Sequence, residues 1–132
     1  MMRAVLADAG PLYAAVDPED AYHKRALHEL QTLDRDRRQI VILYSTLLEA
    51  YSLIMFRLGR DVASNWLKEM ADATLVNPTR EDYGQAAAKI RALADQPITL
   101  FDAVAGVVAT RLRVKVWTYD YHFDVMRVGV WR

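Results

Sequence analysis

Short apolar segments alternate with stretches of helical periodicity along this chain, and this alternation constrains the fold more than any other feature. The strand-like segments are residues 3–7, 39–44, 73–76 and 114–118. Between them, apolar residues recur at the three- and four-residue spacing of amphipathic helices. Strands separated by helices favour βαβ units, so the sequence predicts an α/β fold with a mainly parallel central sheet.

Capping and turn residues predict where several helices begin. Residues 9–11, Ala-Gly-Pro, favour a turn after the first strand. Asp17, followed by proline, predicts a helix start, and Ser45 is a candidate cap for a later helix. Thr79 and Asp82 have the spacing of a capping box, so we expect another helix to begin there.

The bulk properties predict one domain over residues 1–132 and a soluble, cytoplasmic protein. A length of 132 residues is sufficient for a hydrophobic core without disulfides, and the chain has no cysteine. No apolar run approaches the ~18 residues of a membrane helix, and the N-terminus lacks the apolar stretch of a signal peptide. A hydrophobic fraction of 53% leaves apolar surface for a partner.

Four carboxylates close or interrupt apolar segments. Asp8 ends the first strand, Glu49 lies inside an apolar helix, Asp102 opens the last long helix and Asp120 follows the last long strand. Acidic residues are rarely buried unless they are paired or bound to a metal. We therefore expect the fold to gather these four side chains into one acidic pocket. All-oxygen ligands suit Mg²⁺ or Mn²⁺.

The charge balance restricts the partners of the chain. Equal numbers of acidic and basic residues, 17 each, argue against a purely electrostatic nucleic-acid binder. If a metal ion neutralises four carboxylates, the remaining 13 acidic residues face 17 basic ones, a balance of +4. This balance permits a substrate that carries phosphate groups.

Structural roles compete with the proposed ligand roles. The alternatives are a turn cap for Asp8, an ion pair with Arg57 or Arg60 for Glu49, a helix cap for Asp102 and a turn for Asp120. Asp124 is interpreted mainly as a structural residue. The histidines are also interpreted as structural, with His122 assigned to the surface or to packing. Base stacking and packing at the sheet edge are both open for three tyrosines: Tyr13, Tyr119 and Tyr121.

Five motifs, in this order and spacing, resemble the PIN domain and, within it, the VapC-like toxins of toxin–antitoxin pairs. They are residues 5–12 (VLADAGPL), 20–26 (DAYHKRA), 45–49 (STLLE), 100–103 (LFDA) and 118–124 (TYDYHFD). The resemblance covers nearly the whole chain. It implies a PIN-like three-layer fold, in which helices flank a central, mainly parallel sheet.

The resemblance also implies a Mg²⁺-dependent endoribonuclease, with Mn²⁺ as a possible substitute. In such enzymes the metal activates water for attack on a phosphodiester. Asp8, Glu49 and Asp102 correspond to the core of the metal site. Asp120 completes it directly or through water, and Asp124 is a further candidate at its periphery. Many relatives carry a hydroxyl residue directly after the first aspartate, where this chain has Ala9, so Thr118 and Ser45 are considered as alternative hydroxyl donors.

The implied partners are an RNA substrate, a VapB-like antitoxin whose inserted segment blocks the acidic pocket, and a second copy of the chain in a homodimer. No membrane association is expected. Two other functions are compatible with the same residues. One is a non-catalytic PIN-like binding or regulatory module, and the other is a metal-dependent nuclease acting on DNA, or a phosphatase.

Overall fold

Four parallel strands form the centre of the protein, which is described by a computed structural model over residues 3–132. The strand order is β3-β2-β1-β4. The bounds are Ala4–Ala7 for β1, Gln39–Leu43 for β2, Thr74–Val76 for β3 and Lys115–Trp117 for β4. Every strand pair is parallel, which confirms the predicted α/β class. The N-terminal strand β1 is central, because Leu6 pairs with Val41 of β2 and with Val116 of β4.

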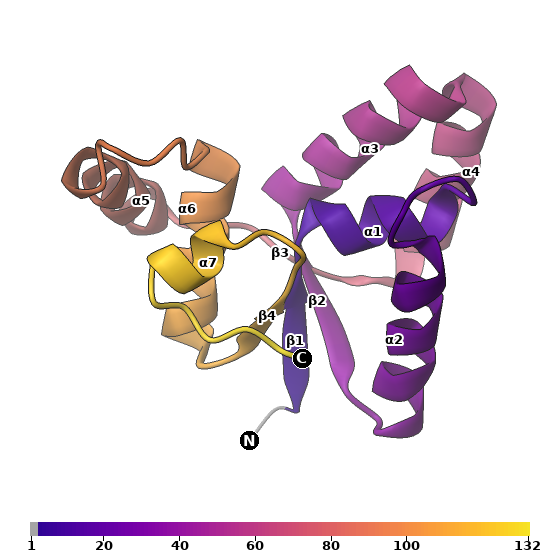
Figure 1. Cartoon of the computed structure of the whole chain (residues 1–132), viewed down its shortest axis with the longest axis horizontal. Helices are drawn as coiled ribbons and strands as arrows, with labels where there is room; N and C mark the ends of the chain where they lie inside the picture. Colours follow the sequence, from indigo (N-terminus) through magenta and orange to yellow (C-terminus); the bar gives the residue numbers. More distant parts are fainter. Residues whose placement is uncertain (1–2) are drawn as a thin grey trace.

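Helices cover both faces of this sheet (Figure 1). Helices α1 to α4 lie on one side, and α5, α6 and α7 lie on the other. Their bounds are Ala9–Val16 (α1), His23–Arg35 (α2), Tyr44–Leu58 (α3), Arg60–Glu69 (α4), Arg80–Ala92 (α5), Leu100–Leu112 (α6) and His122–Val125 (α7), with a 3-10 turn at Met70–Asp72. Within residues 3–132, none of these helices is both long and apolar enough to span a membrane.

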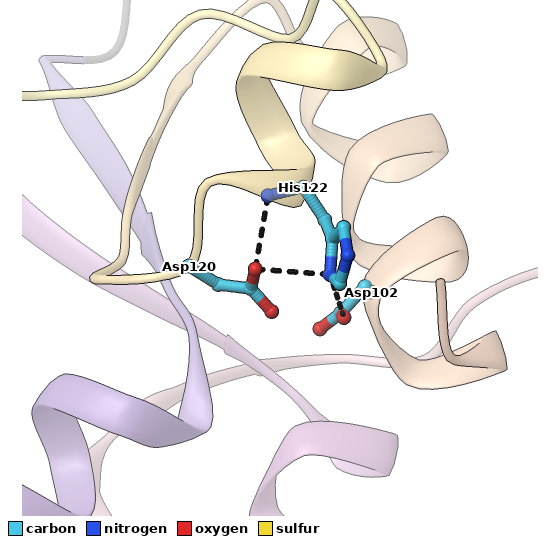
Figure 2. Close-up of side chains that lie close together, drawn as sticks. All are labelled: Asp102, Asp120 and His122. Carbon is cyan, nitrogen blue, oxygen red and sulfur yellow. Dashed lines mark hydrogen bonds and ion pairs between the residues drawn. The ribbon is translucent and has the colours of Figure 1, made fainter. Parts of the chain in front are cut away.

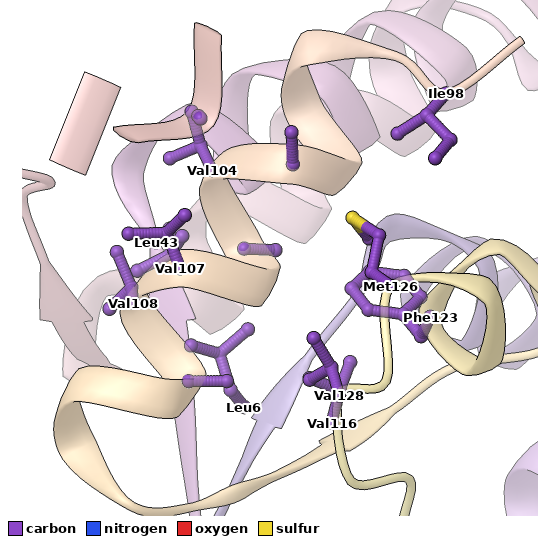
Figure 3. Close-up of a cluster of buried hydrophobic side chains, with 14 residues drawn as sticks. Leu6, Leu43, Ile98, Val104, Val107, Val108, Val116, Phe123, Met126 and Val128 are labelled. Carbon is purple, nitrogen blue, oxygen red and sulfur yellow. The ribbon is translucent and has the colours of Figure 1, made fainter. Parts of the chain in front are cut away.

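The side chains of each strand alternate between two hydrophobic clusters. Leu6 of β1 belongs to the cluster that surrounds α6 (Figure 3). Val5 and Ala7 belong to the cluster on the other side, which includes residues of α1, α3 and α4. In β4, Val116 and Trp117 divide in the same way. Because side chains point to opposite faces at successive strand positions, this alternation explains why both faces of the two central strands are mainly apolar.

Helix caps place one acidic residue at the edge of the sheet. The capping box of α5 is present as predicted, with the Asp82 N–H donating to the Thr79 hydroxyl and the Thr79 N–H donating to the Asp82 carboxylate. Thr99 caps α6 by accepting the N–H of Asp102 at 3.1 Å. Asp102 therefore lies in the first turn of α6, where the exposed backbone N–H groups favour a negative charge.

Two predicted features near the N-terminus are wrong. Residues 9–11 form the first turn of α1, because a proline there lacks only an N–H that the first helical turn leaves free. Asp17 ends α1, and the next helix begins only at His23. The Asp17 carboxylate accepts hydrogen bonds from the Tyr13 hydroxyl at 2.6 Å and from the Glu19 N–H at 2.9 Å.

The predicted cap of α3 is also wrong. The helix begins at Tyr44, so Ser45 lies inside it and is not its cap. The Ser45 hydroxyl is buried and has no hydrogen-bond partner among the described residues. At the other end Gly59 terminates the helix, with a φ of 97° that favours glycine.

Candidate active site

Four carboxylates line one cleft at the carboxyl ends of the strands. Asp8 follows β1 directly, and Asp120 follows β4 by three residues. Asp102 comes from the first turn of α6 and Glu49 from the second turn of α3. All four are among the residues that line a cleft of about 460 Å³, which we call the acidic cleft. The structure therefore brings together the four acidic residues that the sequence singled out.

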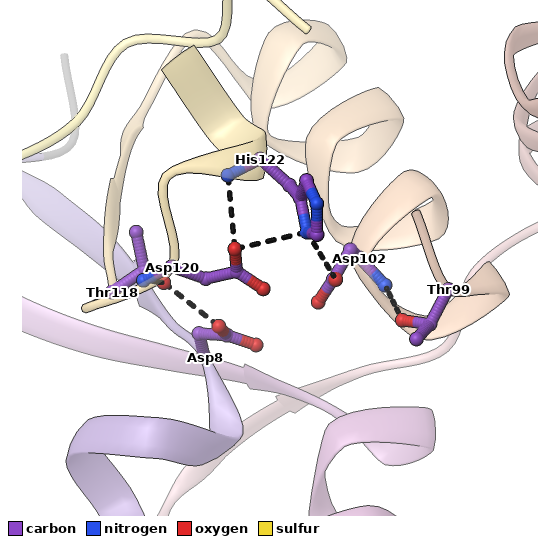
Figure 4. A network of polar contacts seen from close by, with 6 residues as sticks. All are labelled: Asp8, Thr99, Asp102, Thr118, Asp120 and His122. Carbon is purple, nitrogen blue, oxygen red and sulfur yellow. Dashed lines mark hydrogen bonds and ion pairs between the residues drawn. The ribbon is translucent and has the colours of Figure 1, made fainter. Parts of the chain in front are cut away.

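Asp8 is held by the far end of the chain. It lies at the N-cap position of α1, yet its side chain makes no capping hydrogen bond. Instead, its carboxylate accepts a hydrogen bond from the Thr118 hydroxyl at 2.8 Å (Figure 4). Its N–H donates to the Trp117 carbonyl at 2.9 Å. The side chain is only 7% exposed. A capping role therefore does not explain why Asp8 is buried. Asp8 instead lines the acidic cleft.

Asp120 is fixed by the turn that leads into α7. Its N–H donates to the Thr118 hydroxyl at 3.0 Å, so Thr118 contacts two of the four acids. The Asp120 carboxylate accepts the backbone N–H of His122 at 2.9 Å. These bonds direct the carboxylate towards Asp8 and Asp102 (Figure 4).

Burial and mutual repulsion raise the pKa values of three of these acids. Burial is the largest cause for Glu49, whose pKa rises to about 7, and the charges of the other three acids add to it. The pKa of Asp102 is raised by burial first and then by the charges of Asp8 and Asp120. Burial also raises the pKa of Asp8, although the hydrogen bond from Thr118 opposes this. The cleft thus holds more negative charge than its surroundings stabilise.

No lysine or arginine of residues 3–132 forms an ion pair with any of the four carboxylates. The alternative pairing of Glu49 with Arg57 or Arg60 is therefore not observed. Arg57 lines the cleft, but its guanidinium lies over the ring of Tyr13 at 5.0 Å. The charge in the cleft calls for a compensating cation that the side chains do not supply.

His122 is the residue that the sequence interpretation missed. It is buried, and its Nδ1 lies 3.0 Å from the Asp120 carboxylate and 4.0 Å from that of Asp102. Ligand atoms of these three residues all lie within 4.8 Å of one another. The spacing of two residues between Asp120 and His122 hinted at this proximity, but Asp102 joins them only through the packing of α7 against α6.

Asp124 has a different environment from the four cleft acids. Its carboxylate pairs with Arg132 at 2.9 Å, and half of its side chain is exposed. It is not among the residues that line the acidic cleft. This position is consistent with the structural role that the sequence favoured.

The tyrosines near the cleft divide into packed and exposed residues. Tyr13 is buried with its hydroxyl on Asp17, and the Tyr119 hydroxyl donates to Glu29 at 2.5 Å. Tyr121 is 62% exposed and lines the cleft. Of the three tyrosines considered for base stacking, Tyr121 alone presents most of its ring to solvent.

Comparisons with known proteins agree with this architecture. No family model matches the sequence, and no curated protein is significantly similar to it. Among solved structures, VapC20 of Mycobacterium tuberculosis, a sarcin–ricin loop cleaving toxin, superposes with a TM-score of 0.84 at 16% identity, over 98% of this chain and 99% of that one. VapBC2 from Rickettsia felis, bound to a DNA fragment from its promoter, gives 0.74 at 11% identity, over 96% of each chain. FitAcB from Neisseria gonorrhoeae gives 0.69 at 15% identity, over 97% of this chain and 96% of that one.

At sequence identities this low, the superpositions establish a shared fold alone. The parallel sheet, its helices on both faces and the full-length superposition together show that the chain has the PIN-like α/β fold of these structures.

Proposed function

We propose that this protein is a divalent-metal-dependent endoribonuclease and the toxin of a toxin–antitoxin pair. The observation that carries the proposal is the acidic cleft, where four carboxylates converge without a lysine or arginine partner among residues 3–132. Such a cluster is unfavourable for stability unless a cation binds there. The fold shared with a sarcin–ricin loop cleaving toxin supports RNA as the substrate.

The donor set fits a hard divalent cation. Asp8, Glu49, Asp102 and Asp120 would hold it, and their carboxylate oxygens are the ligands that Mg²⁺ and Mn²⁺ prefer. When bound, the cation lowers the pKa of a water molecule and stabilises negative charge on the phosphate. Its charge would also depress the raised pKa values of Glu49 and Asp102, because an opposite charge favours the ionised form.

Other residues orient the acids and the substrate. Thr118 fixes Asp8 through its hydroxyl and Asp120 through that residue's N–H, in the hydroxyl role that Ala9 cannot fill. Arg57, on the wall of the cleft, is placed to contact a phosphate group. The exposed ring of Tyr121 offers a surface on which an unpaired base can stack. These contacts would hold an RNA strand across the carboxylates. We assign the protein to the cytoplasm, where RNA substrates are found.

A second surface has the properties of a binding site for other protein chains. Tyr44, Leu48, Tyr83, Leu100 and Phe101 are exposed and line a groove of about 330 Å³, which we call the apolar groove. It borders the acidic cleft, because Leu48 precedes Glu49 and Phe101 precedes Asp102. Exposed apolar patches of this kind mark interaction sites. We assign the apolar groove to a homodimer and the acidic cleft to the inserted segment of a VapB-like antitoxin.

Cleavage of RNA by the purified protein tests the activity. Total cellular RNA, a sarcin–ricin loop hairpin and a DNA hairpin of the same sequence would each be incubated with Mg²⁺, with Mn²⁺ or with EDTA. We expect discrete, metal-dependent RNA fragments that disappear in Asp102→Asn. The matched control is Asp61→Asn, because Asp61 is an exposed acid outside the cleft and, like Asp102, lies in the first turn of a helix.

Other results would favour the competing functions. Equal cleavage of the DNA hairpin would indicate a DNA nuclease. An absence of cleavage by folded, antitoxin-free protein would indicate a non-catalytic binding module.

The oligomeric state tests the apolar groove. We expect Leu48→Glu to convert the homodimer to a monomer in multi-angle light scattering. Phe56→Glu is the matched control, since Phe56 is on the same helix and 81% exposed but outside the groove. Equal effects of the two variants, or a monomeric parent protein, would contradict the assignment.

A further inference from the structure

His122 is a buried polar residue whose side chain the fold does not satisfy. It is 9% exposed, and both ring nitrogens are inaccessible to solvent and lack a hydrogen-bond partner among the described residues. Burying a polar group without a partner is costly, and most buried side-chain nitrogens are hydrogen-bonded. The unpartnered imidazole therefore calls for an explanation from its surroundings.

The Nδ1 atom of His122 faces two carboxylates of the acidic cleft (Figure 2). It lies 3.0 Å from Oδ1 of Asp120 and 4.0 Å from Oδ2 of Asp102. The first distance is short, but Oδ1 already accepts the backbone N–H of His122 at 2.9 Å and lies off the direction that a ring N–H requires. A hydrogen bond from the ring to Asp120 does not account for this arrangement.

The spacing of the three groups matches the spacing of ligands around one ion. With metal–ligand bonds of about 2.1 Å, octahedral ligands are about 3.0 Å apart at right angles and about 4.2 Å apart across the ion. The two observed distances from Nδ1 are 3.0 Å and 4.0 Å. The ligand atoms of Asp102, Asp120 and His122 all lie within 4.8 Å of one another, so only small movements would close them on a cation.

We propose that His122 Nδ1, Asp102 and Asp120 form a mixed nitrogen–oxygen cation position that binds a divalent transition metal, with Mn²⁺ as the probe, in preference to Mg²⁺. The inference rests on the proposed metal-dependent function and adds the class of cation. Mg²⁺ is bound almost entirely by oxygen, whereas imidazole is a good ligand for transition metals. A nitrogen ligand in the cleft therefore favours a transition metal over Mg²⁺, and Nδ1 of the buried imidazole gains the partner that the protein alone does not provide.

Pulsed electron paramagnetic resonance of bound Mn²⁺ tests the ligand directly and needs no activity. We expect a ¹⁴N coupling of a directly bound imidazole in the parent protein, replaced by a ¹⁵N coupling when histidine is ¹⁵N-labelled. This comparison uses the unmodified sequence, so it is independent of any effect of substitution on folding. The absence of nitrogen coupling at bound Mn²⁺, or the absence of Mn²⁺ binding, would overturn the inference.

A variant pair then identifies the histidine. His122→Asn retains an oxygen donor, so the coupling should vanish and the Kd for Mn²⁺ should rise about tenfold or more, while the Kd for Mg²⁺ changes by less than about threefold. His28→Asn is the control, because His28 is exposed on α2. An equal loss of both cations would show that His122 only positions the carboxylates, and would reject the nitrogen ligand.

The outcome is separable from that of the cleavage assay. Nitrogen-coupled Mn²⁺ without RNA cleavage would keep the cation position and reject the ribonuclease. RNA cleavage with equal affinity for Mg²⁺ and Mn²⁺, and no nitrogen coupling, would keep the ribonuclease and reject the nitrogen-containing cation position.

Discussion

Replacing Glu49 by glutamine is expected to stabilise the metal-free protein, although it removes a side chain of the acidic cleft. In the unfolded chain this carboxyl group ionises near pH 4.5, whereas in the folded protein burial and the neighbouring acids raise its pKa to about 7. Between these values the folded state binds more protons than the unfolded state. The free energy of unfolding therefore falls as pH rises through this window and stays low above it.

The magnitude follows from the pKa. One pKa unit corresponds to about 1.4 kcal/mol, so a rise from 4.5 to about 7 corresponds to about 3.5 kcal/mol at most. Glu49 is half-buried, and solvent screens part of the repulsion, which leaves roughly 1–2 kcal/mol. For a domain of this length the expected increase in Tm is roughly 4–7 °C.

Thermal unfolding in EDTA at pH 8 and at pH 4 measures this effect. Glu49→Gln should exceed the parent protein in Tm at pH 8 and match it at pH 4, where the folded carboxyl group is protonated. Glu19→Gln is the control, because Glu19 is exposed and outside the cleft. A lower Tm for Glu49→Gln, or an increase that is equal at both pH values, would refute the electrostatic reasoning.

Four further substitutions test the supports of the fold and the cleft. Thr118→Val removes the hydroxyl that holds Asp8, so Mn²⁺ affinity measured by calorimetry should fall about tenfold. Arg111→Met leaves the buried carboxylate of the α5 capping box unpaired, and denaturant unfolding should show a loss of about 3 kcal/mol with unchanged Mn²⁺ affinity. Gly59→Ala places a Cβ at a φ of 97° and should cost about 1–3 kcal/mol, whereas Gly84→Ala, inside α5, should stabilise by about 0.5–1 kcal/mol. Equal effects of the two glycine substitutions would contradict the backbone argument.

Local signals in the sequence were sufficient for much of the fold. The parallel sheet followed from the alternation of strands and helices, and the capping box at Thr79 was predicted from four residues. The first turn of α1 was missed, because Gly10 and Pro11 favour a turn as well as a helix start. Asp17 was assigned to the wrong helix end, since its partners, Tyr13 and Glu19, lie on both sides of it in sequence.

The site was predicted where residue type alone restricts the possibilities. A carboxylate at the end of a buried strand has few favourable environments, so Asp8 and Asp120 were conspicuous in the sequence. A histidine is common in cores and on surfaces, so His122 carried no comparable signal. Its proximity to Asp102 depends on how α7 packs against α6, and a single sequence does not encode that contact in any short motif.

The hydrogen bond between Asp8 and Thr118 joins residues 110 positions apart, and the strand that follows residue 114 pairs with the strand that precedes Asp8. A ribosome therefore produces the first acid of the cleft long before the last. Until β4 has emerged and paired beside β1, Asp8 lacks its hydroxyl donor and Asp120 has no fixed position. A chain that stops before β4 therefore lacks the side chain that holds Asp8, and the acidic cleft forms only after residues 115–120 have been added.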